Sequence, residues 1–144
     1  MIRQATKYDK PQIVKLMKEF YSELNFDTEI SLDNEDYWDN LLNTIIYGRG
    51  VIFIDDNIGL VIGIINSTLW DPKTLTLNCV AWAVKPEYRN KTYGYSLLKA
   101  YIDYAEQLVK EGRIKYYTLG KTPKTPNMNY TKLGFRKTDE TWVK

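Results

Sequence analysis

The stretch VKPEYRNKTYGYSLL, residues 84–98, joins a strand end, a short basic turn and the start of a helix. Val84 closes an apolar run, and Pro86 cannot continue a central strand because it has no backbone N–H to donate. From Gly94 onward, apolar residues recur at helical spacing until Gly112. A basic turn at a helix N-terminus offers backbone N–H groups and positive charge to an anion such as phosphate. The same pattern also fits a purely structural turn, because every helix begins with such groups.

A second segment, NYTKLGF at residues 129–135, follows a proline-containing loop. The order V-x-P-x-Y-R-x-K-x-x-G-x-x-L-L and then Y-x-K-L-G-F resembles the GNAT superfamily of acyl-CoA-dependent N-acyltransferases. In that family the first segment holds the pyrophosphate of acyl-CoA, and the second carries a tyrosine beside the thioester sulfur. The family pattern R/Q-x-x-G-x-G/A falls on Arg89, Thr92 and Gly94, so threonine replaces the first glycine. Threonine can offer its N–H there if φ is negative, whereas a positive φ would strain it.

The resemblance implies which residues form the site. Tyr130 would protonate or hydrogen-bond the departing sulfur, unless it serves only as a core tyrosine. Backbone N–H groups near Val84 would polarise the thioester and align the cofactor. The residues expected to bind the cofactor are Trp82, Ala83, Val84, Arg89, Asn90, Lys91, Thr92, Tyr93, Gly94 and Tyr95. Some relatives carry a glutamate base on the same strand, but the equivalent residue here is Asn78, so the proton must leave through water or through another carboxylate.

The absence of histidine excludes several classes of site. Ser-His-Asp and Cys-His catalysis, HExxH metalloproteases and Cys/His zinc fingers all require it. With Cys79 as the one cysteine, thiolate zinc sites and intrachain disulfides are excluded too, and we expect no metal ion. We interpret Cys79 as a small buried residue, because no basic partner activates it. Any general base must be a carboxylate, a tyrosine, a lysine or a relayed water.

Length and composition predict a single GNAT-like acetyltransferase domain over residues 1–144. The chain is 44% hydrophobic, which suffices for one core and leaves no room for a second domain. No apolar run approaches the roughly 20 residues that span a bilayer, and the first residues begin no signal peptide. These features, together with the single cysteine, predict a cytoplasmic protein without a membrane partner. A homodimer is one assembly that the sequence allows.

Hydrophobic periodicity predicts an α+β fold, with a mixed, mostly antiparallel sheet flanked by about four helices. The expected order is β-α-α-β-β-β-α-β-α-β, which is also the order of the GNAT family. Strands are expected at residues 2–5, 51–54, 58–69, 75–84, 114–119 and 134–143. Helices are expected at about residues 9–24, 34–47 and 94–109, with a short fourth helix starting at Pro126 and capped by Thr125.

Charge is divided unevenly along the chain. Residues 1–84 carry seven basic and twelve acidic residues, a net charge of −5, and residues 85–144 carry thirteen basic and six acidic residues, a net charge of +7. One interpretation is ordinary solvated surface. The other is that the basic half faces a phosphorylated cofactor and the acidic half faces a cation. Nucleic acid would also suit the basic half, but the lysines are scattered and no nucleic-acid motif is present.

Eight acidic residues and no basic one lie between residues 19 and 39. They are Glu19, Glu23, Asp27, Glu29, Asp33, Glu35, Asp36 and Asp39. In the GNAT family this region helps to form the acceptor side, so the resemblance implies a cationic acceptor: a small amine, a polyamine or a protein lysine. The expected function is transfer of an acetyl group from acetyl-CoA to such an amine by direct attack. The alternatives are a catalytically degenerate domain that binds or senses acyl-CoA, and a nucleic-acid or protein interaction domain.

Overall fold

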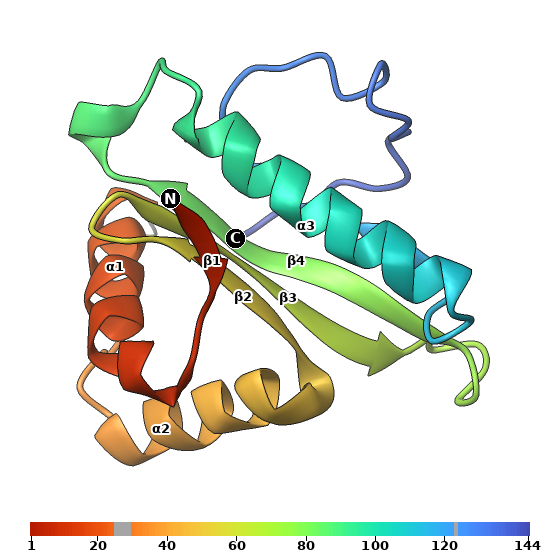
Figure 1. The fold of residues 1–144 in the computed structure, drawn as a ribbon, viewed down its shortest axis with the longest axis horizontal. Coiled ribbons are helices and arrows are strands. Elements are labelled where there is room, and N and C mark those ends of the chain that lie inside the picture. Colours follow the sequence, from red (N-terminus) through yellow and green to blue (C-terminus); the bar gives the residue numbers. More distant parts are fainter. Residues whose placement is uncertain (25–29, 123) are drawn as a thin grey trace.

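The computed structural model describes residues 1–24, 30–122 and 124–144. A five-stranded sheet, in which the strands follow chain order, divides it into two layers of helices (Figure 1). The strands are β1 (Ile2–Gln4), β2 (Gly50–Asp55), β3 (Gly59–Ser67), β4 (Leu75–Val84) and β5 (Tyr116–Thr118). The helices are α1 (Lys10–Glu23), α2 (Glu35–Thr44) and α3 (Tyr93–Lys110). The first four strands are antiparallel and β5 runs parallel to β4, so the predicted α+β class and mostly antiparallel sheet are confirmed.

Alternation along the strands builds one core on each face of the sheet. In β3, Leu60 and Ile62 pack with residues of α1 and α2, whereas Val61 packs with residues of α3. The buried positions of α3 keep helical spacing, which aligns them on one face of the helix. These positions are Gly94, Leu97, Leu98, Tyr101, Ala105 and Leu108. Among the described residues, no helix combines the length and apolarity needed to cross a membrane.

Asn34 and Gly48 set the boundaries of α2 and of the irregular turn that follows it. Asn34 caps its N-terminus by accepting a hydrogen bond from the backbone N–H of Tyr37 at 3.1 Å. The regular helix ends at Thr44, three residues earlier than predicted, and continues into an irregular turn, Ile45–Arg49. Gly48 adopts a φ of 134° in this turn. Because side-chain-bearing residues rarely adopt that conformation, the glycine ends the helix and directs the chain into β2.

The predicted C-terminal helix and final strand are wrong. In the described part of the chain beyond β5 there are turns but no helix or strand, so the described residues form three α-helices rather than about four. Thr125 does not cap a helix, because its hydroxyl accepts the backbone N–H of Thr122 at 2.8 Å. Asn129 accepts the N–H of Lys132 and closes a single turn. Residues 136–140, RKTDE, contain no apolar side chain that pairing as a strand would bury.

An ion-pair network joins β1, the start of α1 and the turn between β2 and β3. Arg3 donates two hydrogen bonds to the carboxylate of Asp9, at 2.7 and 2.8 Å, and two to that of Asp56, at 2.8 and 3.2 Å. The backbone N–H of Thr6 also donates to Asp9, at 2.7 Å. The bonds from Arg3 and Thr6 outweigh the effect of burial and lower the pKa of Asp9 to about 2. Asp9 is 9% exposed, whereas the side chains of Arg3 and Asp56 are 41% and 50% exposed, so water shields Asp9 less than it shields its partners.

We predict that Asp9 makes the protein less stable in acid. Its pKa is lowered by folding, so its contribution is complete above the unfolded value near 3.9 and is lost as the pH falls toward 2. Urea unfolding at pH 6 and pH 3 should show a fall in the free energy of unfolding that Asp9→Asn reduces by about 1 kcal/mol, since part of the contribution remains at pH 3. Asp139→Asn, at an exposed C-terminal residue, is the control. Equal pH dependence in both variants would contradict the prediction.

Candidate functional site

The two backbone edges of β4 are paired to different extents. Toward β3, pairing runs from Leu75 to Val84. Toward β5, it is limited to Thr76, Leu77 and Asn78. Beyond Asn78, no strand among the described residues lies on the β5 side of β4. Residues 79–84, which we call the free edge, therefore keep backbone N–H and C=O groups that a ladder would otherwise use.

A β-bulge marks the beginning of the free edge. Ile62 pairs with Ala81 and Gly63 pairs with Cys79, which leaves Val80 as an extra residue in β4. The side chain of Val80 is 53% exposed. Because a bulge leaves its extra residue out of the ladder, it changes the direction of the backbone next to it. The sequence did not predict the bulge, because Cys79 and Val80 are ordinary strand residues and the glycine opposite them, Gly63, lies on the partner strand β3.

The basic turn follows β4 as predicted, and Thr92 is compatible with it. A 3₁₀ turn, Pro86–Tyr88, leads toward α3. The positive φ in this connection falls on Asn90, at 61°, whereas Thr92 has a φ of −89°. Asparagine tolerates the left-handed region better than most residues, and threonine is unstrained at its own angle. The side chain of Thr92 makes no capping hydrogen bond, so it does not accept from the first backbone N–H groups of α3.

Arg89 links the end of β4 to the end of α1. Its Nε donates a hydrogen bond to the carbonyl oxygen of Val84 at 2.9 Å. Its Nη2 forms an ion pair with Glu23 of α1 at 2.6 Å. The two side chains are 26% and 23% exposed, so the pair is partly shielded from water. Arg89, the first residue of the R/Q-x-x-G-x-G/A pattern, is thus positioned beside the basic turn, but its charge is paired with that of Glu23.

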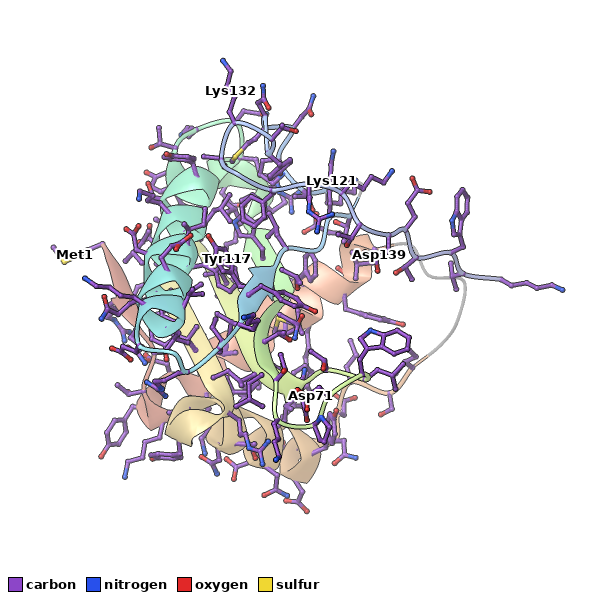
Figure 2. All side chains as sticks on the ribbon, turned by 90° about the vertical axis from the view of Figure 1, so that its right-hand side faces the viewer. Met1, Asp71, Tyr117, Lys121, Lys132 and Asp139 are labelled. Atoms are coloured by element: carbon purple, nitrogen blue, oxygen red, sulfur yellow. The ribbon has the colours of Figure 1, made fainter. Side chains whose placement is uncertain are left out.

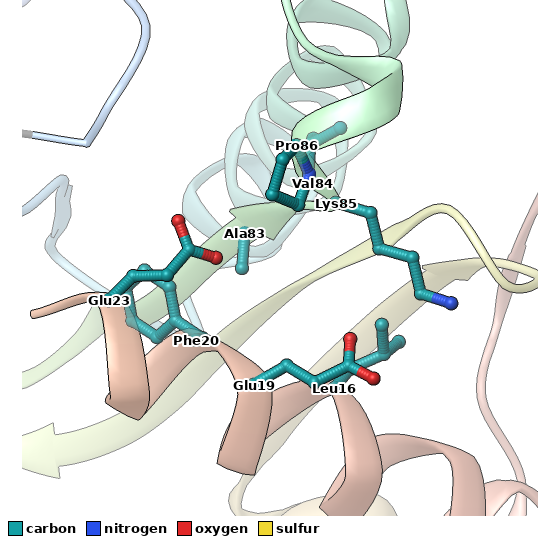
Figure 3. Close-up of a pocket in the computed structure, with 8 residues that line it drawn as sticks. All are labelled: Leu16, Glu19, Phe20, Glu23, Ala83, Val84, Lys85 and Pro86. Atoms are coloured by element: carbon teal, nitrogen blue, oxygen red, sulfur yellow. The ribbon is translucent and has the colours of Figure 1, made fainter.

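A small pocket lies between α1 and the end of β4 (Figure 3). Glu19 and Glu23 extend from the helix toward the strand end, with the aromatic ring of Phe20 between them along the chain. The lining residues are Leu16, Glu19, Phe20, Glu23, Ala83, Val84, Lys85 and Pro86. Two of the eight acidic residues expected on the acceptor side therefore line a pocket that also contains residues expected to bind the cofactor.

The remaining acidic residues of that segment have other surroundings. Asp33 and Asp39 form ion pairs with lysines of α1, at 3.1 and 2.7 Å. Glu35 and Asp36 lie in the first turn of α2, where carboxylates interact favourably with the helix dipole. Two others lie outside the described residues: Asp27 and Glu29. The segment is therefore less uniformly available to a cation than its sequence indicates.

Tyr130 lies against Trp82 near the start of α3. The two rings meet edge to face, with centroids 6.4 Å apart. The indole N–H of Trp82 donates to the carbonyl oxygen of Gly94 at 3.1 Å, which ties β4 to α3. The hydroxyl of Tyr130 donates to the carbonyl oxygen of Pro126. Burial raises the pKa of Tyr130, so the phenol keeps its proton at neutral pH.

The other residues expected to bind the cofactor gather around the same turn. Tyr93 packs edge to face on Tyr88, at 5.5 Å between centroids. Gly94 is buried, and a Cβ there would lie 3.3 Å from Cγ of Pro126. The exposed members are Asn90, Lys91, Thr92 and Tyr95. Lys121 and Lys132 lie on the segment beyond β5 (Figure 2), and the ammonium group of Lys121 is 5.7 Å from the ring centroid of Tyr130.

Cys79 has the surroundings of a packing residue. It packs against the core on the α3 side of the sheet, and its thiol donates to the carbonyl oxygen of Ala81 at 3.5 Å. Burial raises the pKa of the thiol to about 12. Because only the thiolate is a good nucleophile, the group is unreactive at neutral pH, which agrees with the interpretation made from the sequence.

This arrangement of strand, turn and helix matches a known protein family. The model of the acetyltransferase (GNAT) family matches residues 12–135. The chain belongs to this family. It is therefore an acyltransferase of the GNAT type, as the two sequence segments predicted. Among curated proteins, no sequence matches the chain.

Several solved structures share the GNAT fold of this chain at low sequence identity. A predicted acetyltransferase of Clostridium acetobutylicum, crystallised with acetyl-CoA, is 18% identical, with a TM-score of 0.72 over 100% of this chain and 94% of that one. A GCN5-related N-acetyltransferase of Ralstonia eutropha is 17% identical, with a TM-score of 0.70 over 100% and 97%. Glucosamine-6-phosphate N-acetyltransferase of Arabidopsis thaliana is 15% identical, with a TM-score of 0.67 over 100% and 96%.

Proposed function

We propose that this GNAT protein transfers an acetyl group from acetyl-CoA to a cationic primary amine. The observation that carries the proposal is the continuity between the free edge of β4, the basic turn and the start of α3, whose first N–H groups Thr92 does not cap with its side chain. A free strand edge suits an extended amide-containing arm, and a helix N-terminus suits phosphate. Both features lie on consecutive residues, in the order in which the parts of acyl-CoA are joined.

The residues of the turn fit a pyrophosphate. Thr92 keeps its N–H in an unstrained helical conformation, and Gly94 brings no side chain to the start of the helix. Arg89 adds a cation next to the turn, and Lys91 adds an exposed one. Binding of a phosphate at Arg89 would compete with Glu23, because one guanidinium edge now faces that carboxylate.

In the transfer, the amine nitrogen bonds to the thioester carbonyl carbon, the carbon–sulfur bond breaks, the amine loses a proton and the thiolate gains one. Tyr130 can donate a proton or a hydrogen bond to the sulfur, because its raised pKa keeps the phenol protonated. It would have to release the carbonyl of Pro126 to do so. Asn78 has no basic group, so we assign proton removal from the amine to water or to a carboxylate such as Glu19.

The acidic pocket supports a cationic acceptor. Glu19 and Glu23 line it together with Phe20, and once a phosphate draws Arg89 away from Glu23, a ring beside two carboxylates can hold an ammonium group and its aliphatic stem. A small amine, a polyamine and a protein lysine all have this chemistry. Residues 1–144 would act as one catalytic domain, alone or as a homodimer, in the cytoplasm.

A second candidate is a domain that binds acyl-CoA without turning it over. Asn78 favours it, because the strand position that carries a glutamate base in some relatives has no base here. Such a domain would bind acetyl-CoA but release no CoA with any amine. An interaction domain for nucleic acid or protein would neither bind acetyl-CoA nor release CoA from it.

We predict that Arg89 and Glu23 affect acetyl-CoA binding in opposite directions. Arg89→Gln should weaken binding about three- to tenfold, because a partly shielded phosphate contact is lost. Glu23→Gln should strengthen it by a similar factor, because the guanidinium no longer has a competing carboxylate. Isothermal titration calorimetry measures both. Arg113→Gln, at an exposed arginine near Glu111, should bind like the unmodified protein; weaker binding in Glu23→Gln would show that Glu23 only orients Arg89.

Replacement of Tyr130 by phenylalanine separates chemistry from packing. Tyr130→Phe keeps the ring on Trp82 and removes the hydroxyl, so we expect kcat to fall about 10- to 1000-fold with little change in acetyl-CoA affinity. Release of free CoA, followed with a thiol reagent, gives kcat. Full activity in Tyr130→Phe would identify Tyr130 as a packing residue.

An amine panel tests the acceptor. Polyamines and lysine peptides should support CoA release, and acidic amino acids should not. Glu19→Gln should raise the KM for the cationic amine about three- to tenfold, since one exposed charge is removed. Glu111→Gln, at the far end of α3, is the matched control. Acetylation of neutral or anionic amines alone would exclude a cationic acceptor.

A further inference from the structure

Asn78 uses both ends of its side-chain amide where β4 and β5 part. Its Nδ2 donates a hydrogen bond to the hydroxyl of Thr76 at 3.0 Å. Its Oδ1 accepts a hydrogen bond from the hydroxyl of Thr118, in β5, at 2.9 Å. Asn78 and Thr118 are also the last backbone partners of the two strands. A side-chain bond, which we call the fork tie, therefore crosses between the strands at the inner end of the free edge.

The opposite face of the sheet holds the same point with Tyr101 of α3. Its hydroxyl lies 2.7 Å from the carbonyl oxygen of Thr118 and 3.4 Å from that of Leu77. The ring fits there because residue 63 is glycine: a Cβ at Gly63 would lie 2.8 Å from Cε2 of Tyr101. The strands are thus joined from both faces, which leaves little freedom for the fork tie to move.

The fork tie lies on the face of the sheet away from α3. Leu77 and Tyr117 belong to the core on the α3 side, so alternation directs their neighbours Asn78 and Thr118 to the other face. Both neighbours are half-buried. Val80, in the bulge, is exposed just beyond them. The amide and the hydroxyl therefore form a polar wall where the free edge begins.

We propose that the fork tie limits the acyl group to about the size of acetyl. The inference rests on the proposed function, in which the pyrophosphate binds at the turn, beyond the outer end of the free edge. The acyl end of the donor then points toward the inner end, where Asn78 and Thr118 lie. A longer alkyl chain would meet the amide and the hydroxyl, and displacing them would leave half-buried polar groups without their partners.

The test compares the binding of acetyl-CoA and butanoyl-CoA by calorimetry without an acceptor, so that it does not depend on turnover. In the unmodified protein, butanoyl-CoA should bind more weakly than acetyl-CoA. Asn78→Ala removes the amide, and Thr118→Val removes the hydroxyl with little change of shape. In both variants the relative affinity for butanoyl-CoA should rise, by about fourfold for each methylene that gains a buried place. Thr118→Ser keeps a hydroxyl at this position and should therefore retain the preference for acetyl-CoA over butanoyl-CoA.

A matched control separates this effect from a general loss of stability. Thr74→Val removes a threonine hydroxyl that donates to Asp71 at 2.7 Å in the hairpin between β3 and β4. It should leave the ratio of the two affinities unchanged. An unchanged ratio in Asn78→Ala and Thr118→Val, or equal binding of both thioesters by the unmodified protein, overturns the inference alone. Absence of binding by either thioester overturns the proposed function as well.

Discussion

The pairing of residues 79–84 of β4 on one side only is the constraint on which the rest of the structure depends. A strand edge in the middle of a sheet would ordinarily be paired, because exposed backbone groups invite contacts with other chains. Here β5 is only three residues long, and the chain leaves the sheet after Thr118. Tyr117 anchors the departing segment: its ring packs against Tyr101 and Phe135, and its hydroxyl donates to Glu106 of α3. The free edge stays unpaired because the chain after β5 leaves β4 and is held against α3 and Phe135.

The two ends of the free edge differ in chemistry. The outer end is charged: Arg89 and Glu23 form an ion pair beside the basic turn, and ligand charge can redistribute such a pair. The inner end is neutral, and its polar side chains are joined by hydrogen bonds of 2.9 and 3.0 Å among Asn78, Thr76 and Thr118. A ligand along the edge would therefore meet an adaptable anion site at one end and a rigid wall at the other. Binding of the phosphate and selection for the size of the acyl group are therefore assigned to opposite ends of the free edge.

Much of the fold was predictable from residues 84–98 and from the periodicity of the strands. The bounds of β4 agree with the prediction, and α3 begins one residue before the predicted start, because apolar spacing and proline mark those boundaries. The C-terminal strand was predicted wrongly, because β-branched residues such as Thr138, Thr141 and Val143 are typical of a strand, while the charged residues among them offer no face to bury. The structure also resolves a point that the sequence left open, because the positive φ falls on Asn90 and spares Thr92.

Parts of the site depend on contacts between distant residues, which a single sequence does not reveal. The bulge at Val80, the ion pair between Arg89 and Glu23, and the fork tie each join segments whose proximity follows from the sheet register. Asn78 was identified only as a missing base. Its hydrogen bonds to two threonines became visible when β5 was placed beside β4. The sequence contains Asn78, Thr76 and Thr118 but does not show that their side chains are hydrogen-bonded to one another.

The burial of Cys79 has a practical consequence for following motion in this protein. Burial raises the pKa of its thiol to about 12, and the residue packs against the core on the α3 side, so maleimide reagents will not react with it at neutral pH. A cysteine introduced at the exposed tip of the β3–β4 hairpin, for example at Trp70, would then be the reactive thiol without removal of the native one. Fluorescent or spin labels can in this way report on the sheet while the packing around the fork stays intact.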